Sequence, residues 1–133
     1  MLVVAWQKSE GKKAEGRRLM SLVTMKTLLE RAENEHRGVG AFSVGNMEMV
    51  KGAVQAAEEL NTSIILQIAE VRLKHSPLEL MGPMMVQAAK EAKVDIAVHL
   101  DHGLTAAVVQ KALDLGFTSV MFDSSTYPFE ENI

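Results

Sequence analysis

The fold of this chain is decided by residues 96–103, which read Ile-Ala-Val-His-Leu-Asp-His-Gly. An apolar run leads directly into two imidazoles and a carboxylate and then into glycine, which is typical of a buried strand that delivers polar groups to its carboxyl end. Because residues two apart on a strand share a face, His99 and Asp101 point the same way, and His102 can turn in from the following loop. We call the edge of the sheet at the carboxyl ends of its strands the rim. Polar groups at the rim suit metal binding by a neutral imidazole or proton transfer by the carboxylate.

These polar residues also have structural interpretations. A histidine beside a strand is most often a core residue satisfied by a backbone carbonyl, and we favour this interpretation for His99 taken alone. Asp101 and His102 together favour a function, because a carboxylate at the end of an apolar strand loses hydration unless a metal ion, a proton or a substrate compensates it.

Three other segments share the apolar character of residues 96–100, and all four are predicted to be strands. The other three cover residues 39–44, 63–69 and 119–122. Helical patterns cover residues 47–60, 78–92 and 105–115, and a further helix runs from Met25 to a stop at Gly38. Strands that alternate with helices in this way predict parallel βαβ units with right-handed crossovers.

Local signals mark the ends of these helices. Thr24, Asn46 and Thr105 are expected to be N-caps, since each can accept a hydrogen bond from a backbone N–H of the first turn. The pair Gly82-Pro83 predicts a helix start or a kink within residues 78–92, because proline removes a backbone donor.

Parallel βαβ units close either as a doubly wound sheet or as part of a (β/α)8 barrel. No Gly-x-Gly-x-x-Gly motif follows any of the strands, which disfavours a dinucleotide-binding sheet. Polar residues instead recur at the strand ends, namely Ser43, Glu70, Asp101 with His102, and Asp123 with Ser124. Four strands that offer polar groups at one rim are typical of a barrel.

The composition bounds the size and class of the protein. A chain of 133 residues, 47% of them hydrophobic, supports one domain with its own core. The net charge of −3, with both signs interspersed, and the short apolar runs argue against nucleic acid and membrane partners, so we expect a cytoplasmic protein. Because the chain has no cysteine, thiolate ligands are excluded and a metal ion must use His, Asp or Glu.

The first residues differ from the rest of the chain. Residues 8–18 are polar, contain two glycines and show no apolar period. We therefore expect residues 1–19 to be a disordered or non-native N-terminal extension, and residues 20–133 to form the domain.

From residue 21 to residue 133 the chain resembles the class II, zinc-dependent ketose-bisphosphate aldolases, which include fructose-bisphosphate and tagatose-bisphosphate aldolases. The most specific parts of the resemblance are residues 99–103 and residues 117–125, which continue into residues 128–132. Weaker support comes from residues 41–46 and 56–60. The resemblance implies the N-terminal half of a (β/α)8 TIM barrel, and residues 20–133 would then be a truncated, partial aldolase domain.

The resemblance also implies roles for individual residues in a lyase of carbohydrate metabolism and glycolysis. Such an enzyme reversibly cleaves a ketose bisphosphate to dihydroxyacetone phosphate and an aldehyde, with Zn²⁺ as cofactor. His102 matches the first of three zinc-binding histidines, and Asp101 matches the aspartate that exchanges a proton with the aldehyde oxygen. Asp123 matches a second metal position, although it could equally cap the segment that follows.

Two residues depart from the family pattern near the expected substrate. Ser43 replaces the usual asparagine of the first strand, and Ala69 replaces a serine that contacts substrate phosphate. Ser43 and Asn46 remain the expected substrate-binding residues, with the alternative that Asn46 is a helix cap and nothing more.

The resemblance ends at Ile133, before the family's other two zinc histidines, its glutamate-bearing loop and its phosphate-binding loops. We therefore expect the isolated chain to bind zinc weakly, to be inactive, and to associate with itself or with a complementing C-terminal half. The alternatives are a non-catalytic half barrel from a truncated or split gene that serves in assembly, and a small α/β module that binds an anion.

Overall fold

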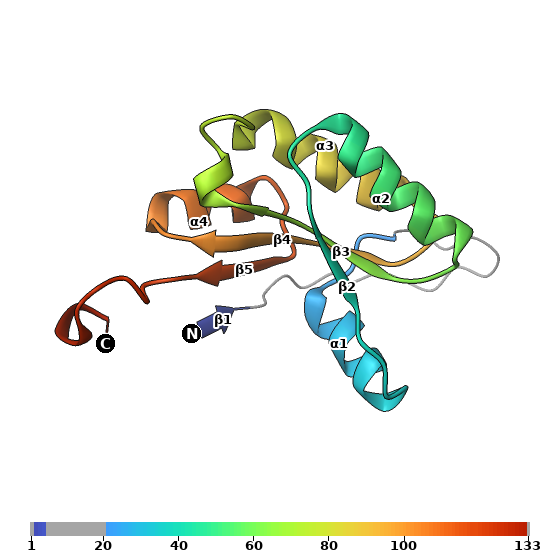
Figure 1. Cartoon of the computed structure of the whole chain (residues 1–133), viewed down its shortest axis with the longest axis horizontal. Helices are drawn as coiled ribbons and strands as arrows, with labels where there is room; N and C mark the ends of the chain where they lie inside the picture. Colours follow the sequence, from blue (N-terminus) through green and yellow to red (C-terminus); the bar gives the residue numbers. More distant parts are fainter. Residues whose placement is uncertain (1, 5–20, 133) are drawn as a thin grey trace.

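Four parallel strands and the helices that connect them form the body of the molecule (Figure 1). The computed structural model describes residues 2–4 and 21–132. The strands are β1 (Leu2–Val4), β2 (Gly40–Ser43), β3 (Ile64–Ala69), β4 (Ile96–Gly103) and β5 (Ser119–Phe122). The helices are α1 (Met25–Asn34), α2 (Met47–Glu59), α3 (Leu78–Glu91) and α4 (Ala106–Asp114), with short 3₁₀ turns η1 (Glu70–Arg72) and η2 (Phe129–Glu131).

The sheet has the order β1-β5-β4-β3-β2. Strands β2 to β5 run parallel to one another, and an α-helix connects each of them to the next. This arrangement confirms the predicted βαβ units. All four carboxyl ends lie at one edge of the sheet, where the polar residues of the strand ends gather.

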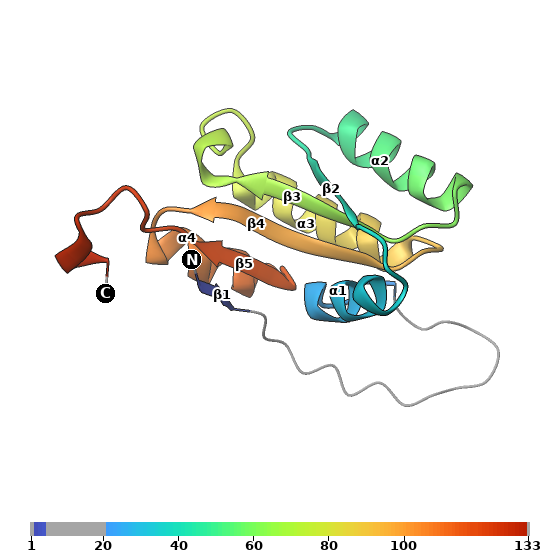
Figure 2. The same ribbon diagram turned by 60° about the horizontal axis from the view of Figure 1, so that its bottom comes forward.

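The two faces of the sheet are covered unequally. Helices α2, α3 and α4 cover one face, where Leu66, Met85, Val98 and Phe117 belong to the main core. Helix α1 lies on the opposite face (Figure 2), and its Leu28 packs with Ile65 and Ala97. These contacts involve the amino-terminal parts of β3 and β4, so α1 leaves the strand ends that carry the polar residues uncovered.

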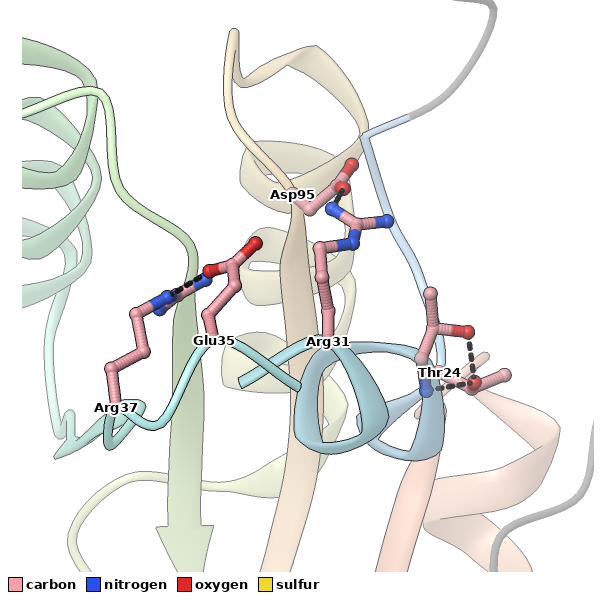
Figure 3. A network of polar contacts seen from close by, with 6 residues as sticks. Thr24, Arg31, Glu35, Arg37 and Asp95 are labelled. Carbon is pink, nitrogen blue, oxygen red and sulfur yellow. Dashed lines mark hydrogen bonds and ion pairs between the residues drawn. The ribbon is translucent and has the colours of Figure 1, made fainter. Parts of the chain in front are cut away.

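An ion pair fastens α1 to the start of β4 (Figure 3). The guanidinium of Arg31 donates a hydrogen bond of 2.6 Å to Asp95, whose side chain is 2% exposed. Nearby, Arg37 pairs with Glu35 just after the helix. The buried carboxylate therefore has a cationic partner, as a charged group in a core requires.

The helix ends follow the predicted caps. The side chains of Thr24, Asn46 and Thr105 accept hydrogen bonds from the backbone N–H three residues later. Helix α1 nevertheless ends at Asn34, well before the expected stop at Gly38, and His36 takes up a left-handed conformation with φ of 52°.

Helix α3 contradicts one of the two interpretations of Gly82-Pro83, that of a helix start. The helix begins at Leu78 and runs through both residues, so no helix starts there. A Cβ on Gly82 would lie 2.9 Å from Leu115 Cδ1 and 3.3 Å from Phe117 Cε1. The glycine thus lets α3 approach the entry of β5, and packing in that contact outweighs the missing N–H of Pro83.

The N-terminal segment contributes a strand that was not predicted. Of residues 1–19, where we expected a disordered extension, the structure describes Leu2–Val4, which pair antiparallel with residues 120–122 of β5. The rest of the expected extension lies outside the described residues. None of the described helices is long and apolar enough to cross a membrane.

Candidate active site at the carboxyl ends of the strands

A β-bulge shapes the end of β4. Leu100 pairs with Val120 and Gly103 pairs with Phe122, so two residues of β4, Asp101 and His102, stand opposite one residue of β5. Such a bulge redirects side chains and breaks the regular alternation of the strand. His102 adopts φ of 46°, a left-handed conformation that is uncommon outside glycine. Strand β4 consequently extends to Gly103, beyond its predicted end at Leu100.

The bulge brings His102 between two carboxylates. Its Nδ1 lies 2.5 Å from Asp123 Oδ2, and its Nε2 lies 3.8 Å from Asp101 Oδ1. The side chain of His102 is 51% exposed, whereas that of Asp123 is 11% exposed. The structure thus places three of the predicted site residues together, two from the bulge of β4 and one that directly follows β5.

The charges of this cluster shift each other's protonation. The hydrogen bond that His102 donates to the Asp123 carboxylate raises the pKa of His102 above its ordinary value, and Asp101 adds to this effect. Hydrogen bonds from Ser125 and then from His102 hold the pKa of Asp123 well below its ordinary value. The backbone N–H of Ser125 donates to Asp123 Oδ1 at 2.9 Å, so this carboxylate also organises the segment that follows it.

A chain of hydrogen bonds connects Asp101 to the neighbouring strands. The amide nitrogen of Gln67 on β3 donates to Asp101 Oδ2 at 3.3 Å and to Ser43 Oγ on β2 at 3.1 Å. Sequence reasoning overlooked Gln67. The signal was available, because Gln67 is the one polar residue in the apolar run of β3.

His99 belongs to the core rather than to the rim. It is 6% exposed, and its Nδ1 shares a hydrogen bond of 2.9 Å with the hydroxyl of Ser119. Burial lowers the pKa of His99. The partner is a side-chain hydroxyl, whereas we expected a backbone carbonyl.

A cavity of about 840 Å³ adjoins His102 on the side of β5. Asp123, Ser125, Tyr127 and Thr105 are among its lining residues, whereas Asn46 and Ser43 are not. Asn46 instead caps α2, with its Oδ1 accepting a hydrogen bond of 2.9 Å from Met49 N. Its expected contact with substrate has no counterpart in the described cavity.

The described residues do not form a metal site by themselves. In residues 2–4 and 21–132 there is no group of three or more His, Asp or Glu side chains arranged to hold a metal ion. His102 is nevertheless suited to be one ligand, because Asp123 engages its Nδ1 and leaves Nε2 for a cation. A carboxylate on the second ring nitrogen is a common way of orienting a metal-binding histidine.

The fold and the rim define a class, that of parallel α/β-barrel proteins with a polar site at the carboxyl ends of the strands. The chain belongs to the class II fructose-bisphosphate aldolase family, whose model matches residues 23–133. This membership confirms the resemblance drawn from residues 99–103 and 117–125.

Individual relatives support the same assignment. Over 112 residues, the chain is 46% identical to a fructose-bisphosphate aldolase of Thermus caldophilus, covering 84% of this chain and 36% of the relative. Over 113 residues, it is 42% identical to a sulfofructosephosphate aldolase of Alkalicoccus urumqiensis, covering 85% and 39%. The crystal structure of the YdjI aldolase from Escherichia coli K12 superposes with a TM-score of 0.78 at 32% identity, covering 84% of this chain and 43% of that one.

These coverages confirm the predicted fold class. The chain corresponds to an N-terminal part of the aldolase barrel, with four parallel strands and their helices. It spans less than two fifths of the length of the two curated relatives named above.

Proposed function

We propose that this chain forms the N-terminal part of a class II aldolase site that reversibly cleaves a ketose phosphate, typically a bisphosphate, to dihydroxyacetone phosphate and an aldehyde. The single observation that carries the proposal is the bulge at the end of β4, which places Asp101 and His102 side by side at the rim. Family membership supports it further.

Asp101 is the proposed acid and base. Its carboxylate is held by Gln67 at 3.3 Å, and this contact keeps it at the rim rather than in the sheet. A carboxylate fixed in this way can take a proton from the hydroxyl of the ketose carbon chain during cleavage and return it during condensation.

His102 is the proposed zinc ligand, through Nε2. A divalent cation bound there supplies a Lewis acid that polarises the carbonyl and hydroxyl oxygens of the dihydroxyacetone phosphate unit. Asp123 contacts Nδ1 of the imidazole, and this contact supports the role of orienting His102. This role for Asp123 is proposed in addition to its predicted place at a second metal position.

Ser43 is the better supported of the two predicted substrate-binding residues. Its hydroxyl joins Asp101 through Gln67, so it shares the rim with the proposed acid and base. The amide of Asn46 caps α2 with its oxygen, which leaves only its nitrogen for a substrate. We further propose a cytoplasmic protein without nucleic acid or membrane partners, in line with the charge pattern.

The test is to coexpress this chain with the remaining, C-terminal part of the Thermus caldophilus aldolase and to measure zinc-dependent cleavage of ketose phosphates. Asp101→Asn should lower turnover by about 10²- to 10⁴-fold with zinc still bound. His102→Ala should lose zinc. Equal zinc content in the wild type and the His102→Ala variant would contradict the metal assignment.

The alternative is a half barrel that serves only in assembly or binds an anion. The exposed outer strand β2 favours this alternative, because it can pair with another chain without any chemistry. A complemented barrel that assembles and binds zinc but cleaves no ketose phosphate would support it.

A further inference from the structure

The chain just after His102 is held by the carboxylate of Glu70, the first residue of η1. Glu70 follows β3 directly, and its Oε2 accepts hydrogen bonds from Leu104 N at 2.6 Å and Thr105 N at 3.1 Å. Its Oε1 accepts a third from Thr105 Oγ1 at 3.0 Å. Three bonds to one carboxylate join segments that are 34 and 35 residues apart in the sequence.

The backbone of His102 needs support of this kind. A left-handed conformation at a residue other than glycine costs free energy and persists only where the surroundings hold it. On the β5 side, Gly103 O accepts a hydrogen bond of 2.8 Å from Asp123 N. A Cβ on Gly103 would lie within 3.1 Å of Met121 O, so the bulge also packs tightly against β5.

On the β3 side, Glu70 supplies the hydrogen bonds that correspond to the bond between Asp123 N and Gly103 O. Its carboxylate binds the first two amides after Gly103, so the bulge is fixed from both neighbouring strands. Hydrogen bonds to a charged acceptor are stronger than those between neutral groups.

We propose that Glu70 is a positioning residue for His102, acting through the backbone of residues 103–105 to hold the imidazole in its place against Asp123. Only the functional consequence, a change in zinc affinity, rests on the proposed role of His102 as a metal ligand. The positioning itself concerns the structure of the chain without metal.

A purely structural role is the competing explanation. Thr105 is the N-cap of α4, and a carboxylate near a helix N-terminus stabilises the helix through its dipole. Under that explanation, losing Glu70 loosens α4 and lowers stability but leaves the ring of His102 where it is.

The test compares Glu70→Ala, Glu70→Gln and Glu58→Ala in the full chain by NMR. Glu58 is a matched control, because its Oε1 accepts a hydrogen bond of 2.8 Å from Lys93 N, outside the residues that line the His102 cavity. Glu70→Ala should speed hydrogen exchange of the Leu104 and Thr105 amides by about 10- to 100-fold, and it should shift or broaden the His102 ring resonances.

The other two variants separate positioning from stability. Glu70→Gln keeps a carbonyl acceptor and should largely restore the His102 resonances. Glu58→Ala should lower the urea midpoint without moving them. Unchanged His102 resonances in Glu70→Ala, alongside faster amide exchange, would overturn the proposal in favour of a role confined to α4. If Glu70→Ala fails to fold, unchanged resonances in Glu70→Asp, whose shorter side chain cannot reach both amides, would overturn it equally.

Zinc affinity of the complemented barrel gives the functional readout. Glu70→Ala should weaken zinc binding by about 10- to 100-fold, as the loss of an outer-shell support does at other metal sites. A wild-type barrel that binds no zinc would refute the proposed function, whereas the His102 resonances would still decide the role of Glu70.

Discussion

His102 and Asp123 form the most strongly coupled pair at the rim, with 2.5 Å between Nδ1 and Oδ2. The sequence gives no indication that the two residues are partners, because 21 positions separate them. Their proximity follows from the bulge, which turns the imidazole toward the end of β5. The pKa of His102 therefore depends on the geometry of the bulge.

Asp123→Asn should lower the pKa of His102 toward the ordinary value of 6.5, because the raised pKa originates first in the hydrogen bond to Asp123. A pKa raised in the folded state stabilises the fold below the unfolded value, and this stabilisation is lost as pH rises through the folded pKa. The variant should thus lose more stability at mildly acidic pH than at alkaline pH. An NMR titration of His102 and urea unfolding at both pH values provide the measurement. An unchanged His102 pKa would contradict the coupling.

Helix α3 illustrates how an element departs from its local signals. Gly82 and Pro83 are poor helix residues, yet both lie inside α3 because the small glycine permits close contact with Leu115 and Phe117. Gly52 in α2 differs, because no atom outside its chain neighbours and the backbone of its own helix lies within 4 Å of the place where its Cβ would be.

Gly82→Ala and Gly52→Ala should therefore change stability in opposite directions. Gly82→Ala should lower the free energy of unfolding by about 1–2 kcal/mol, because the ring of Phe117 is fully buried and cannot give way. Gly52→Ala should raise it by about 0.5–1 kcal/mol, since alanine loses less backbone entropy in a helix. Urea unfolding curves compare the two, and a stabilised Gly82→Ala would show that α3 packs differently.

The attachment of α1 depends on Arg31. Arg31→Ala should lower the free energy of unfolding by about 1–3 kcal/mol, because Asp95 is buried and loses the guanidinium that lies 2.6 Å away. Lys26→Ala on the same helix removes an exposed pair with Glu30 and should change stability by less than about 0.5 kcal/mol. Equal effects of the two substitutions in thermal unfolding would argue against the anchoring role.

On the scale of the whole molecule, the sheet ends in β2. All four residues of β2 are exposed, and β2 pairs with β3 alone in the described sheet. Phe42 on this strand is 48% exposed, and Met47 and Met49 at the start of α2 are similarly open. An unpaired strand edge next to apolar side chains favours association with another chain.

The isolated chain should therefore sediment as a dimer or larger species at micromolar concentration. Phe42→Lys should shift it toward the monomer, because a charge on an edge strand opposes pairing. Leu60→Lys, which changes a residue 75% exposed at the end of α2, should leave the sedimentation unchanged. A wild-type chain that sediments as a stable monomer would contradict this prediction.

The isolated chain should also fail to retain zinc. A catalytic zinc site normally has three protein ligands, and the described residues offer no group of three His, Asp or Glu suited to a metal ion. Dialysis against zinc-free buffer followed by metal analysis should leave well below one zinc ion per chain. Stoichiometric zinc after dialysis would show that a site exists which these residues do not reveal.

The sequence by itself determined the parallel βαβ order, the rim and the family. Strands such as residues 63–69 and 119–122 are predicted by apolar runs between turn residues. Caps such as Asn46 bind a backbone N–H only three residues away. These are local effects, and a local pattern can be interpreted without knowing the rest of the chain.

The tertiary structure alone decided how the rim residues meet. The bulge at His102, the bond from Gln67 to Asp101 and the hold of Glu70 on residues 104–105 join positions 20 to 35 residues apart. The strand Leu2–Val4 joins β5 across almost the full chain. Hydrogen-bond partners at such separations are chosen by the packing of the sheet and its helices, because each polar group must find whichever partner the folded backbone brings within reach.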